Sequence, residues 1–193
     1  MIGMEESPMT MKKNTSAVDY EPSKILSLFF EWVSAIVIAG VVVALLFSCV
    51  LRIVNVSGDS MKDTFQNGDR LILSNFMYEP HYGDVVVLTR ENDTPLIKRV
   101  IGLAGDRIRI DAVKGVVYRN GEELEEPYVR GGYTPTNGMT KEVTVPEGTL
   151  FVMGDNRSES LDSRILGPQS LDHLVGRVLY RIAPNPGTVT NGE

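Results

Sequence analysis

The sequence predicts a mainly β protein: an antiparallel β-sheet domain with a small β appendage, preceded by one N-terminal transmembrane helix. Two patterns favour this fold class. One is an uncharged run of twenty residues at 32–51, and the other is a series of short apolar runs after it, separated by Gly, Asn, Asp and Pro. Hydrophobic residues make up 42% of the chain and charged residues 23%, which excludes both a disordered chain and a protein with many membrane spans.

The uncharged run predicts a transmembrane anchor at 32–51, after a cytoplasmic leader at 1–31. Twenty helical residues are about 30 Å long, which crosses the core of a bilayer once. A cleavable secretory signal has a shorter apolar stretch, of about 7–15 residues, close to a basic N-terminus, so we interpret the run as a permanent anchor. Lys and Arg lie at similar distances on both sides of it, so the charge distribution leaves its orientation open.

The apolar runs after the anchor predict about eight strands in a domain at 52–183. The run 107–111 alternates strictly between charged and apolar residues, which is the pattern of a half-exposed strand. The run 116–119 ends at Asn120-Gly121, a strong hairpin turn because both residues tolerate positive φ. The remaining predicted strands lie at 70–73, 85–88, 96–103, 143–145, 150–153 and 175–182.

Two segments interrupt or follow these strands. Residues 107–142 contain a stretch rich in Glu, Pro, Gly, Tyr and Thr, and we expect them to form a small β insertion. Residues 184–193 have no periodicity, and we expect a flexible tail. Cys49 is the only cysteine, so the chain forms no disulfide within itself.

Composition and missing motifs exclude several function classes. The net charge is −6 and no cluster of Lys and Arg is present, which argues against nucleic acid as a partner. The chain has no Gly-rich phosphate loop, no His-Glu-x-x-His and no Cys pair, which argues against nucleotide hydrolysis and zinc chemistry. Either of the two histidines, His81 and His173, is compatible with a Ser-His-Asp site, but neither has a nucleophile nearby in sequence, so we expect both in loops or on the surface.

A turn of small polar residues at 57–61 contains a candidate nucleophile, Ser60. A serine in such a turn can expose its hydroxyl beside converging backbone N–H groups, the geometry that stabilises a tetrahedral oxyanion. A polar turn that only leads the chain away from the membrane has the same composition. Taken alone, this stretch favours the simple polar turn.

Lys98 is a candidate general base. On a strand it shares one face with Leu96 and Val100 while Arg99 lies on the opposite face, so we expect one of the two charges to face inward. Burial disfavours the charged form of lysine, and a pKa about 2–3 units below its usual 10.4 would make the amine a useful base near neutral pH. A neutral lysine amine can take the proton of a serine hydroxyl. A third polar stretch, 154–164, has the composition of a solvated loop with internal Asp–Arg pairs.

These three stretches, in this order after a single span, resemble the motifs of the bacterial type I signal peptidases of the Ser-Lys class. The matching residues are 58–61 (GDSM), 98–106 (KRVIGLAGD), 154–157 (GDNR) and 160–164 (SLDSR), and the resemblance covers 32–182. The segment between Asp106 and Val143 is short compared with the large second domain of some members, which indicates a compact form. The Gly-Asp-Ser-Met motif resembles the variant common in Gram-positive bacteria.

The resemblance implies a role for each matching residue. Ser60 would be the acylated nucleophile and Lys98 the general base, and Ser160 would orient the lysine amine. Asp162 and Arg164 would be a supporting ion pair. The oxyanion hole would use the backbone N–H of Ser60. Many members add a serine hydroxyl two positions earlier, where this chain has Gly58, so a backbone group would have to supply the second donor.

The chain departs from the family pattern at two further positions. Asp63 stands where proline usually follows the serine motif, so the turn there is expected to be less rigid. Ala104 stands where proline is frequent before Gly-Asp. Neither change removes a reacting group.

The function that the resemblance implies is removal of signal peptides from secreted preproteins by cleavage after small residues, of the Ala-x-Ala type, without metal or cofactor. Its partners would be preproteins and the lipid bilayer, with no nucleic acid; the oligomeric state is not predicted. The protein would cross the cytoplasmic membrane once, with a cytoplasmic N-terminus and an extracytoplasmic catalytic domain. The nine residues from Leu51 to Ser60 reach at most about 30 Å, which keeps the nucleophile near the bilayer surface.

Two alternatives compete with this function. A non-catalytic relative that assists assembly of surface structures such as pili usually lacks the serine or the lysine, whereas this chain has both. A self-cleaving repressor of the related Ser-Lys class would have a DNA-binding domain and no membrane span.

Overall fold

The computed structural model describes residues 24–90 and 93–189, and the chain divides into two units, 1–44 and 45–193. Helix α1 (Lys24–Val50) contains a stretch, Leu26–Leu45, that is long and apolar enough to cross a membrane. None of that stretch is buried by the described part of the protein, so its apolar side chains need another apolar environment, which a bilayer supplies.

The helix and the predicted anchor differ at their ends. Of the predicted leader at 1–31, residues 1–23 lie outside the described part of the chain, and the remainder forms the start of α1. The last residue of the predicted anchor, Leu51, begins strand β1 instead. The uncharged run therefore contains both the end of a helix and the start of a strand.

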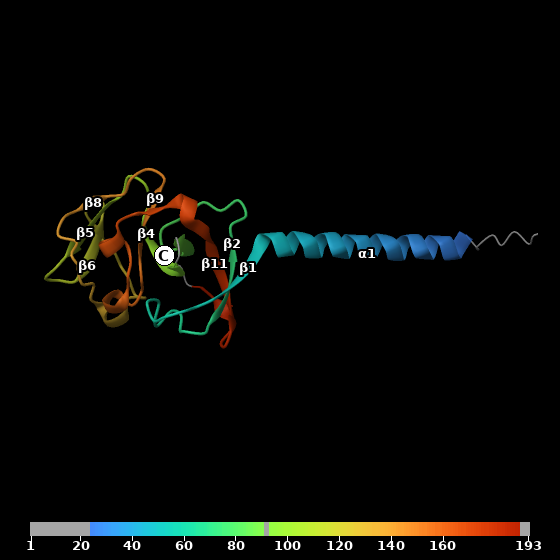
Figure 1. Ribbon diagram of the computed structural model, residues 1–193, viewed down its shortest axis with the longest axis horizontal. Helices are drawn as coiled ribbons and strands as arrows, with labels where there is room; N and C mark the ends of the chain where they lie inside the picture. The colour runs from blue at the N-terminus through green and yellow to red at the C-terminus, as the bar shows by residue number, and fades with distance from the viewer. Residues whose placement is uncertain (1–23, 91–92, 190–193) are drawn as a thin grey trace, which may run out of the picture. The chain divides into compact units, whose positions relative to one another are not determined.

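A large antiparallel sheet forms most of the second unit, in the order β1-β2-β11-β3-β4-β9-β10, with β12 paired to β11 (Figure 1). Its strands are β1 (Leu51–Asn55), β2 (Arg70–Ser74), β3 (Val85–Arg90), β4 (Asp93–Gly102), β9 (Thr149–Met153), β10 (Gln169–Ser170), β11 (Leu174–Ala183) and β12 (Gly187–Thr188). The mainly antiparallel β fold class is confirmed. Strand β12 lies within the segment predicted as a flexible tail, whose last residues, 190–193, are outside the described part.

A smaller sheet of four strands has the order β7-β6-β5-β8 and corresponds to the predicted appendage. It consists of β5 (Arg107–Asp111), β6 (Val116–Arg119), β7 (Glu122–Glu123) and β8 (Val143–Thr144). Ile108 and Ile110 of β5 are buried while Arg107 and Arg109 are exposed, so the strict alternation in the sequence matches a sheet with one covered face.

Four short helical elements lie between the strands. They are η1 (Arg130–Gly132), η2 (Arg157–Glu159), α2 (Ser163–Leu166) and η3 (Leu171–His173).

Strand β4 lies inside the main sheet, between β3 and β9, and is covered on both faces. Ile97, Val100 and Ile101 belong to three different apolar clusters of the core. Consequently both Lys98, 2% exposed, and Arg99, 0% exposed, are buried. The expectation that only one of these two charges faces inward is wrong, because alternation separates a covered face from a solvated one only when a strand has a solvated face.

Candidate active site

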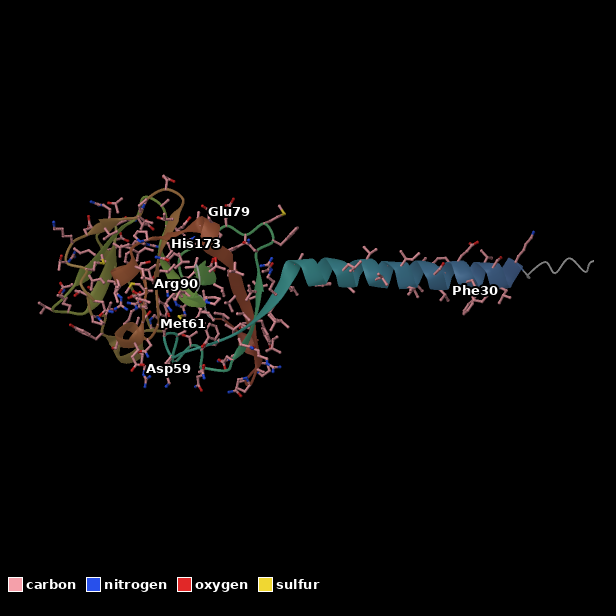
Figure 2. All side chains as sticks on the ribbon, viewed as in Figure 1. Phe30, Asp59, Met61, Glu79, Arg90 and His173 are labelled. Carbon is pink, nitrogen blue, oxygen red and sulfur yellow. The ribbon has the colours of Figure 1, made fainter. Side chains whose placement is uncertain are left out.

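The turn after β1 carries Ser60 and is held in the core by its neighbours. Gly58 has φ +90°, in the left-handed region that glycine adopts without strain, and lets the chain reverse just before the serine. Met61 and Phe65 are both buried in the core cluster beneath the turn. Figure 2 shows Asp59 at the periphery and Met61 further into the domain. Ser60 therefore sits, half-buried, where the turn passes from solvent into the core.

Lys98 of β4 meets this turn directly. Its Nζ donates to Ser60 Oγ over 2.7 Å and to the carbonyl oxygen of Ile97 over 3.0 Å. Within the described part of the chain, no carboxylate forms an ion pair or a hydrogen bond with this ammonium. Burial lowers the pKa of Lys98 to about 8, although the charges of Asp162 and Asp155 oppose the shift. The amine is therefore partly neutral in mildly alkaline solution.

A cavity of about 120 Å³ opens beside Ser60 and Lys98. One wall is formed by residues 56–61, which follow β1 and include Ser60, and the other by residues 94–98 in the first half of β4. Residues 96–98 of β4 pair with β3, but β9 pairs with β4 only from Arg99 onward. Among the strands of the described chain, none covers the second edge of 96–98, so backbone groups there are available to another extended segment.

The loop after β9 supports the Ser60 turn from the side of the protein core. The N–H of Asn156 donates to the Ser60 carbonyl oxygen over 3.0 Å, and the Asn156 side-chain amide donates to the carbonyl oxygen of Asp59 over 3.1 Å. A side chain at Gly154 would collide with the Ser60 carbonyl oxygen and with Ser160 Oγ. The Thr64 hydroxyl donates to Asp155 Oδ2 over 2.5 Å. The loop thus fixes the backbone on both sides of the serine.

Two buried ion pairs hold this loop in place. Arg99 donates from Nε and Nη2 to the two carboxylate oxygens of Asp155, over 2.9 and 2.7 Å. Arg164 pairs with Asp162 in the same two-pronged way, over 2.9 and 2.8 Å. Burial acts to raise the pKa of Asp162, but the hydrogen bonds and charge of Arg164 outweigh it and hold that pKa below its ordinary value. Asp162 therefore stays charged, and both carboxylates are held by two hydrogen bonds each from an arginine.

The comparison with known proteins agrees with this arrangement. Residues 29–183 match the family described as signal peptidase, peptidase S26. The chain belongs to the signal peptidase family. A signal peptidase I of Bacillus licheniformis is 34% identical over 172 residues, which is 83% of this chain and 84% of that relative. A signal peptidase IB of Staphylococcus aureus is 31% identical over 172 residues, 80% of this chain and 89% of that relative.

A solved structure, that of a signal peptidase I from Enterococcus faecalis V583, matches with a TM-score of 0.43 at 29% identity, over 52% of this chain and 97% of that chain. Because it belongs to this family, the chain is a serine peptidase, which is a hydrolase, and it acts in signal-peptide processing.

The structure brings some of the predicted site residues of this signal peptidase together and leaves others apart. Ser60 contacts Lys98, and Asp162 contacts Arg164. Ser160 is buried near Gly154, and its hydroxyl is one of the groups that lower the pKa of Asp162. The N–H of Gly58 donates to Asn67 Oδ1 over 3.1 Å and is thus already engaged.

Sequence reasoning missed the residues that support the signal peptidase site. Arg99, Asp155 and Asn156 lie within the matching motifs, but nothing in the sequence shows that Asp155 and Asn156 hold the segment around Ser60 or that Arg99 holds Asp155. The two histidines are exposed, and neither contacts Ser60 or Lys98; Figure 2 shows His173 apart from Asp59 and Met61. The described chain contains no group of three or more His, Cys, Asp or Glu side chains placed to hold a metal ion.

Proposed function

We propose that this chain is a membrane-anchored endopeptidase that removes signal peptides from secreted preproteins with a Ser60–Lys98 dyad. The observation that carries the proposal is the 2.7 Å contact between Lys98 Nζ and Ser60 Oγ at the end of an uncovered strand edge. A serine beside a buried lysine with a lowered pKa is an activated nucleophile of the Ser-Lys type, because the neutral amine can take the hydroxyl proton. The non-catalytic alternative is not favoured, because an assembly factor has no need of this pair.

The reaction begins when the neutral Lys98 amine accepts the Ser60 hydroxyl proton. Ser60 Oγ then bonds to the carbonyl carbon of the substrate, and the carbonyl oxygen takes the negative charge. The new ammonium returns its proton to the leaving amine as the peptide bond breaks, which leaves the signal peptide esterified to Ser60. Lys98, neutral again, accepts a proton from water, the hydroxide attacks the ester, and the ammonium reprotonates Ser60 Oγ as the acid is released.

The remaining predicted residues support these two. Ser160 has a buried hydroxyl that interacts with the Asp162 carboxylate. Its oxygen would accept a hydrogen bond from the Lys98 ammonium as that group moves during the reaction, which would orient the amine. Because the Gly58 N–H already donates to Asn67, we assign the Ser60 N–H as the main donor to the oxyanion.

The substrate would bind as an added strand on the uncovered edge of β4 at 96–98. This edge lines the cavity of about 120 Å³ that also contains Ser60. Ligand pockets for larger groups are usually about 300–1,000 Å³, so this one has room for small side chains only. Cleavage after small residues, of the Ala-x-Ala type, follows from that size.

The catalytic domain would touch the outer bilayer surface, with the N-terminus in the cytoplasm. Leu51 follows directly on α1 and is the register partner of Ser74, the last residue of β2. Phe76 and Met77 come just after Ser74 and are 66% and 88% exposed. Large apolar side chains this exposed, close to where the chain leaves a membrane helix, have a partner in lipid.

The dyad is tested with a detergent-solubilised preprotein whose signal ends in Ala-x-Ala. We expect Ser60→Ala and Lys98→Ala each to reduce cleavage by about 10⁴-fold or more with the fold retained, because either change removes the activated nucleophile. The matched control is the double variant His81→Ala, His173→Ala, which should cleave at the wild-type rate. Near wild-type cleavage by either dyad variant refutes the assignment, and an inactive wild type would favour the assembly factor.

The lipid contact is tested with Phe76→Ser, Met77→Ser in vesicles. Removing both apolar side chains should slow processing of a vesicle-embedded preprotein by about tenfold, roughly the effect of losing one or two buried apolar side chains, while a short soluble substrate is cleaved as before. Val113→Ser is the control, since Val113 is 91% exposed on the smaller sheet. An equal effect of both changes would contradict a lipid contact at 76–77.

A further inference from the structure

We propose that Glu126 and Tyr128 are positioning residues of the Ser60–Lys98 site, and that they act through two buried arginines. Both residues lie in the segment between β7 and η1, which leads out of the smaller sheet. The inference rests on the proposed function, since it concerns how the same site is held in its working geometry.

Three arginines are buried around the loop after β9: Arg99, Arg157 and Arg164. A buried guanidinium is tolerated only where charged and polar partners surround it. Arg99 and Arg164 find their carboxylates inside the catalytic motifs, in Asp155 and Asp162. Arg157, 0% exposed, finds its carboxylate outside them, in Glu126.

The Arg157 side chain joins Glu126 to the backbone on which Ser60 rests. Its Nη1 and Nη2 donate to the two Glu126 carboxylate oxygens over 2.8 and 2.6 Å, and Nη1 also donates to Thr134 Oγ1 over 2.5 Å. At the other end its Nε donates to the Gly154 carbonyl oxygen over 3.0 Å. Gly154 is the residue whose close approach to Ser60 and Ser160 leaves no room for a side chain.

Tyr128 belongs to this first route, since its hydroxyl donates to Glu126 Oε1 over 3.0 Å, and it also reaches the site by a second one. The guanidinium carbon of Arg99 lies 3.9 Å from the centre of the Tyr128 ring, a cation–π contact out of water. Arg99 is next to Lys98 on β4 and holds Asp155, which in turn accepts from Thr64 in the Ser60 turn. Glu126 and Tyr128 therefore fix two neighbouring residues, Gly154 and Asp155, from the side away from the substrate.

Neither residue lines the cavity beside Ser60. Loosening this support would change two properties of the site. The Ser60 and Lys98 side chains would lose alignment, and misplacement by about 1 Å costs up to about 10²-fold in rate. Water would reach Lys98, and since burial is the main cause of its lowered pKa, that pKa would rise toward its ordinary value.

The test compares Glu126→Gln with Glu125→Gln, its exposed neighbour, in the full-length chain and with wild type assayed in parallel. For Glu126→Gln we expect kcat to fall about 10- to 100-fold, KM to stay within about twofold, and the acid limb of the pH–rate profile to move to higher pH. Glu125→Gln should match wild type. Tyr128→Leu should reproduce the effect. Tyr128→Phe, which keeps the ring on Arg99 but loses the hydrogen bond from the hydroxyl to Glu126 Oε1, should show a smaller fall in kcat.

Each outcome decides the matter. An active wild type with an unchanged kcat in Glu126→Gln overturns the inference, and so does a lower kcat with an unmoved pH profile, which marks a purely structural role. If Glu126→Gln does not fold, Thr134→Val, which removes one hydrogen bond to Arg157, must show a smaller fall in kcat with the same direction of pH shift, and no change there overturns the inference. An inactive wild type refutes the proposed function and the inference together.

Discussion

Lys98 and Arg99 are adjacent in β4 and equally buried, yet their surroundings are opposite. Arg99 donates to both oxygens of Asp155, to the Gly83 carbonyl oxygen and onto the Tyr128 ring. Lys98 donates to one serine hydroxyl and one carbonyl oxygen and has no carboxylate against it among the described residues. One buried cation is surrounded by compensating groups, and the other is left with few.

The difference separates a structural charge from a chemical one. A buried pair that is well hydrogen-bonded stays charged and resists change, because removing one partner leaves the other without compensation. A buried cation with only neutral partners lowers its cost by losing its proton, which is what a general base must do. The same strand thus places a fixed cation and a titrating amine side by side, and three changes of side chain test this contrast.

The largest effect is expected where the fixed charge is removed. Arg99→Leu leaves Asp155 buried without its partner and should lower the free energy of unfolding by about 3–5 kcal/mol. Denaturant unfolding of the detergent-solubilised protein measures this. Adding Asp155→Leu to the same chain should recover part of the loss, because no charge is then left uncompensated. A loss below about 1 kcal/mol would mean that the pair is not the structural element that its geometry indicates.

Several strands and the pairing of Ser60 with Lys98 could be predicted from the sequence. The predicted strands at 70–73, 85–88, 107–111 and 116–119 match β2, β3, β5 and β6, because each is bounded by turn residues and its apolar positions meet a core. The pairing of Ser60 with Lys98 was reached from the three ordered motifs, which preserve chemistry that spacing alone does not reveal.

Sequence reasoning failed where a contact depends on distant parts of the chain. Strand β1 was hidden because Leu51 belongs by composition to the uncharged run, and its strand conformation comes from pairing with β2. Glu126 was taken as part of a polar excursion, because its partner Arg157 lies 31 residues later. Nothing in the sequence around Glu126 or around Arg157 distinguishes a solvated charge from a member of a buried ion pair.

A smaller, pH-dependent effect is expected where the titrating charge is removed. The pKa of Lys98 is about 8 in the folded protein and near 10.5 in the unfolded chain. Below pH 8 both states carry the proton and the folded state bears the full cost. Between pH 8 and 10.5 the unfolded chain binds more protons, so stability rises with pH, by up to about 3 kcal/mol from this group.

The Lys98→Met variant has no titrating amine at this position. It should therefore be more stable than wild type at pH 7.5, by up to about 3 kcal/mol, and the advantage should shrink at pH 10. Denaturant unfolding of both proteins at the two pH values gives the comparison, and other titrating groups cancel in the difference. An advantage of the same size at both pH values would show that the amine does not titrate differently on folding.

The smallest effect is expected from a charge that acts on Lys98 from a distance. Asp162 favours the protonated amine, and Arg164, its partner, disfavours it. Asp162→Asn removes the negative charge that favours the protonated amine and leaves the positive charge of Arg164 without its partner. Both consequences lower the pKa of Lys98. The acid limb of the pH–rate profile, near pH 8 in wild type, should move to lower pH by less than about one unit, since burial remains the main cause of the shift. Rates are divided by the folded fraction measured at each pH, so the midpoint can be read even if Asp162→Asn is less stable. Asp172→Asn, an exposed carboxylate in η3, should leave the midpoint in place. A shift to higher pH would mean that Asp162 acts mainly by keeping water from the amine, and Lys98 would then owe its low pKa to the same packing that Glu126 and Tyr128 maintain.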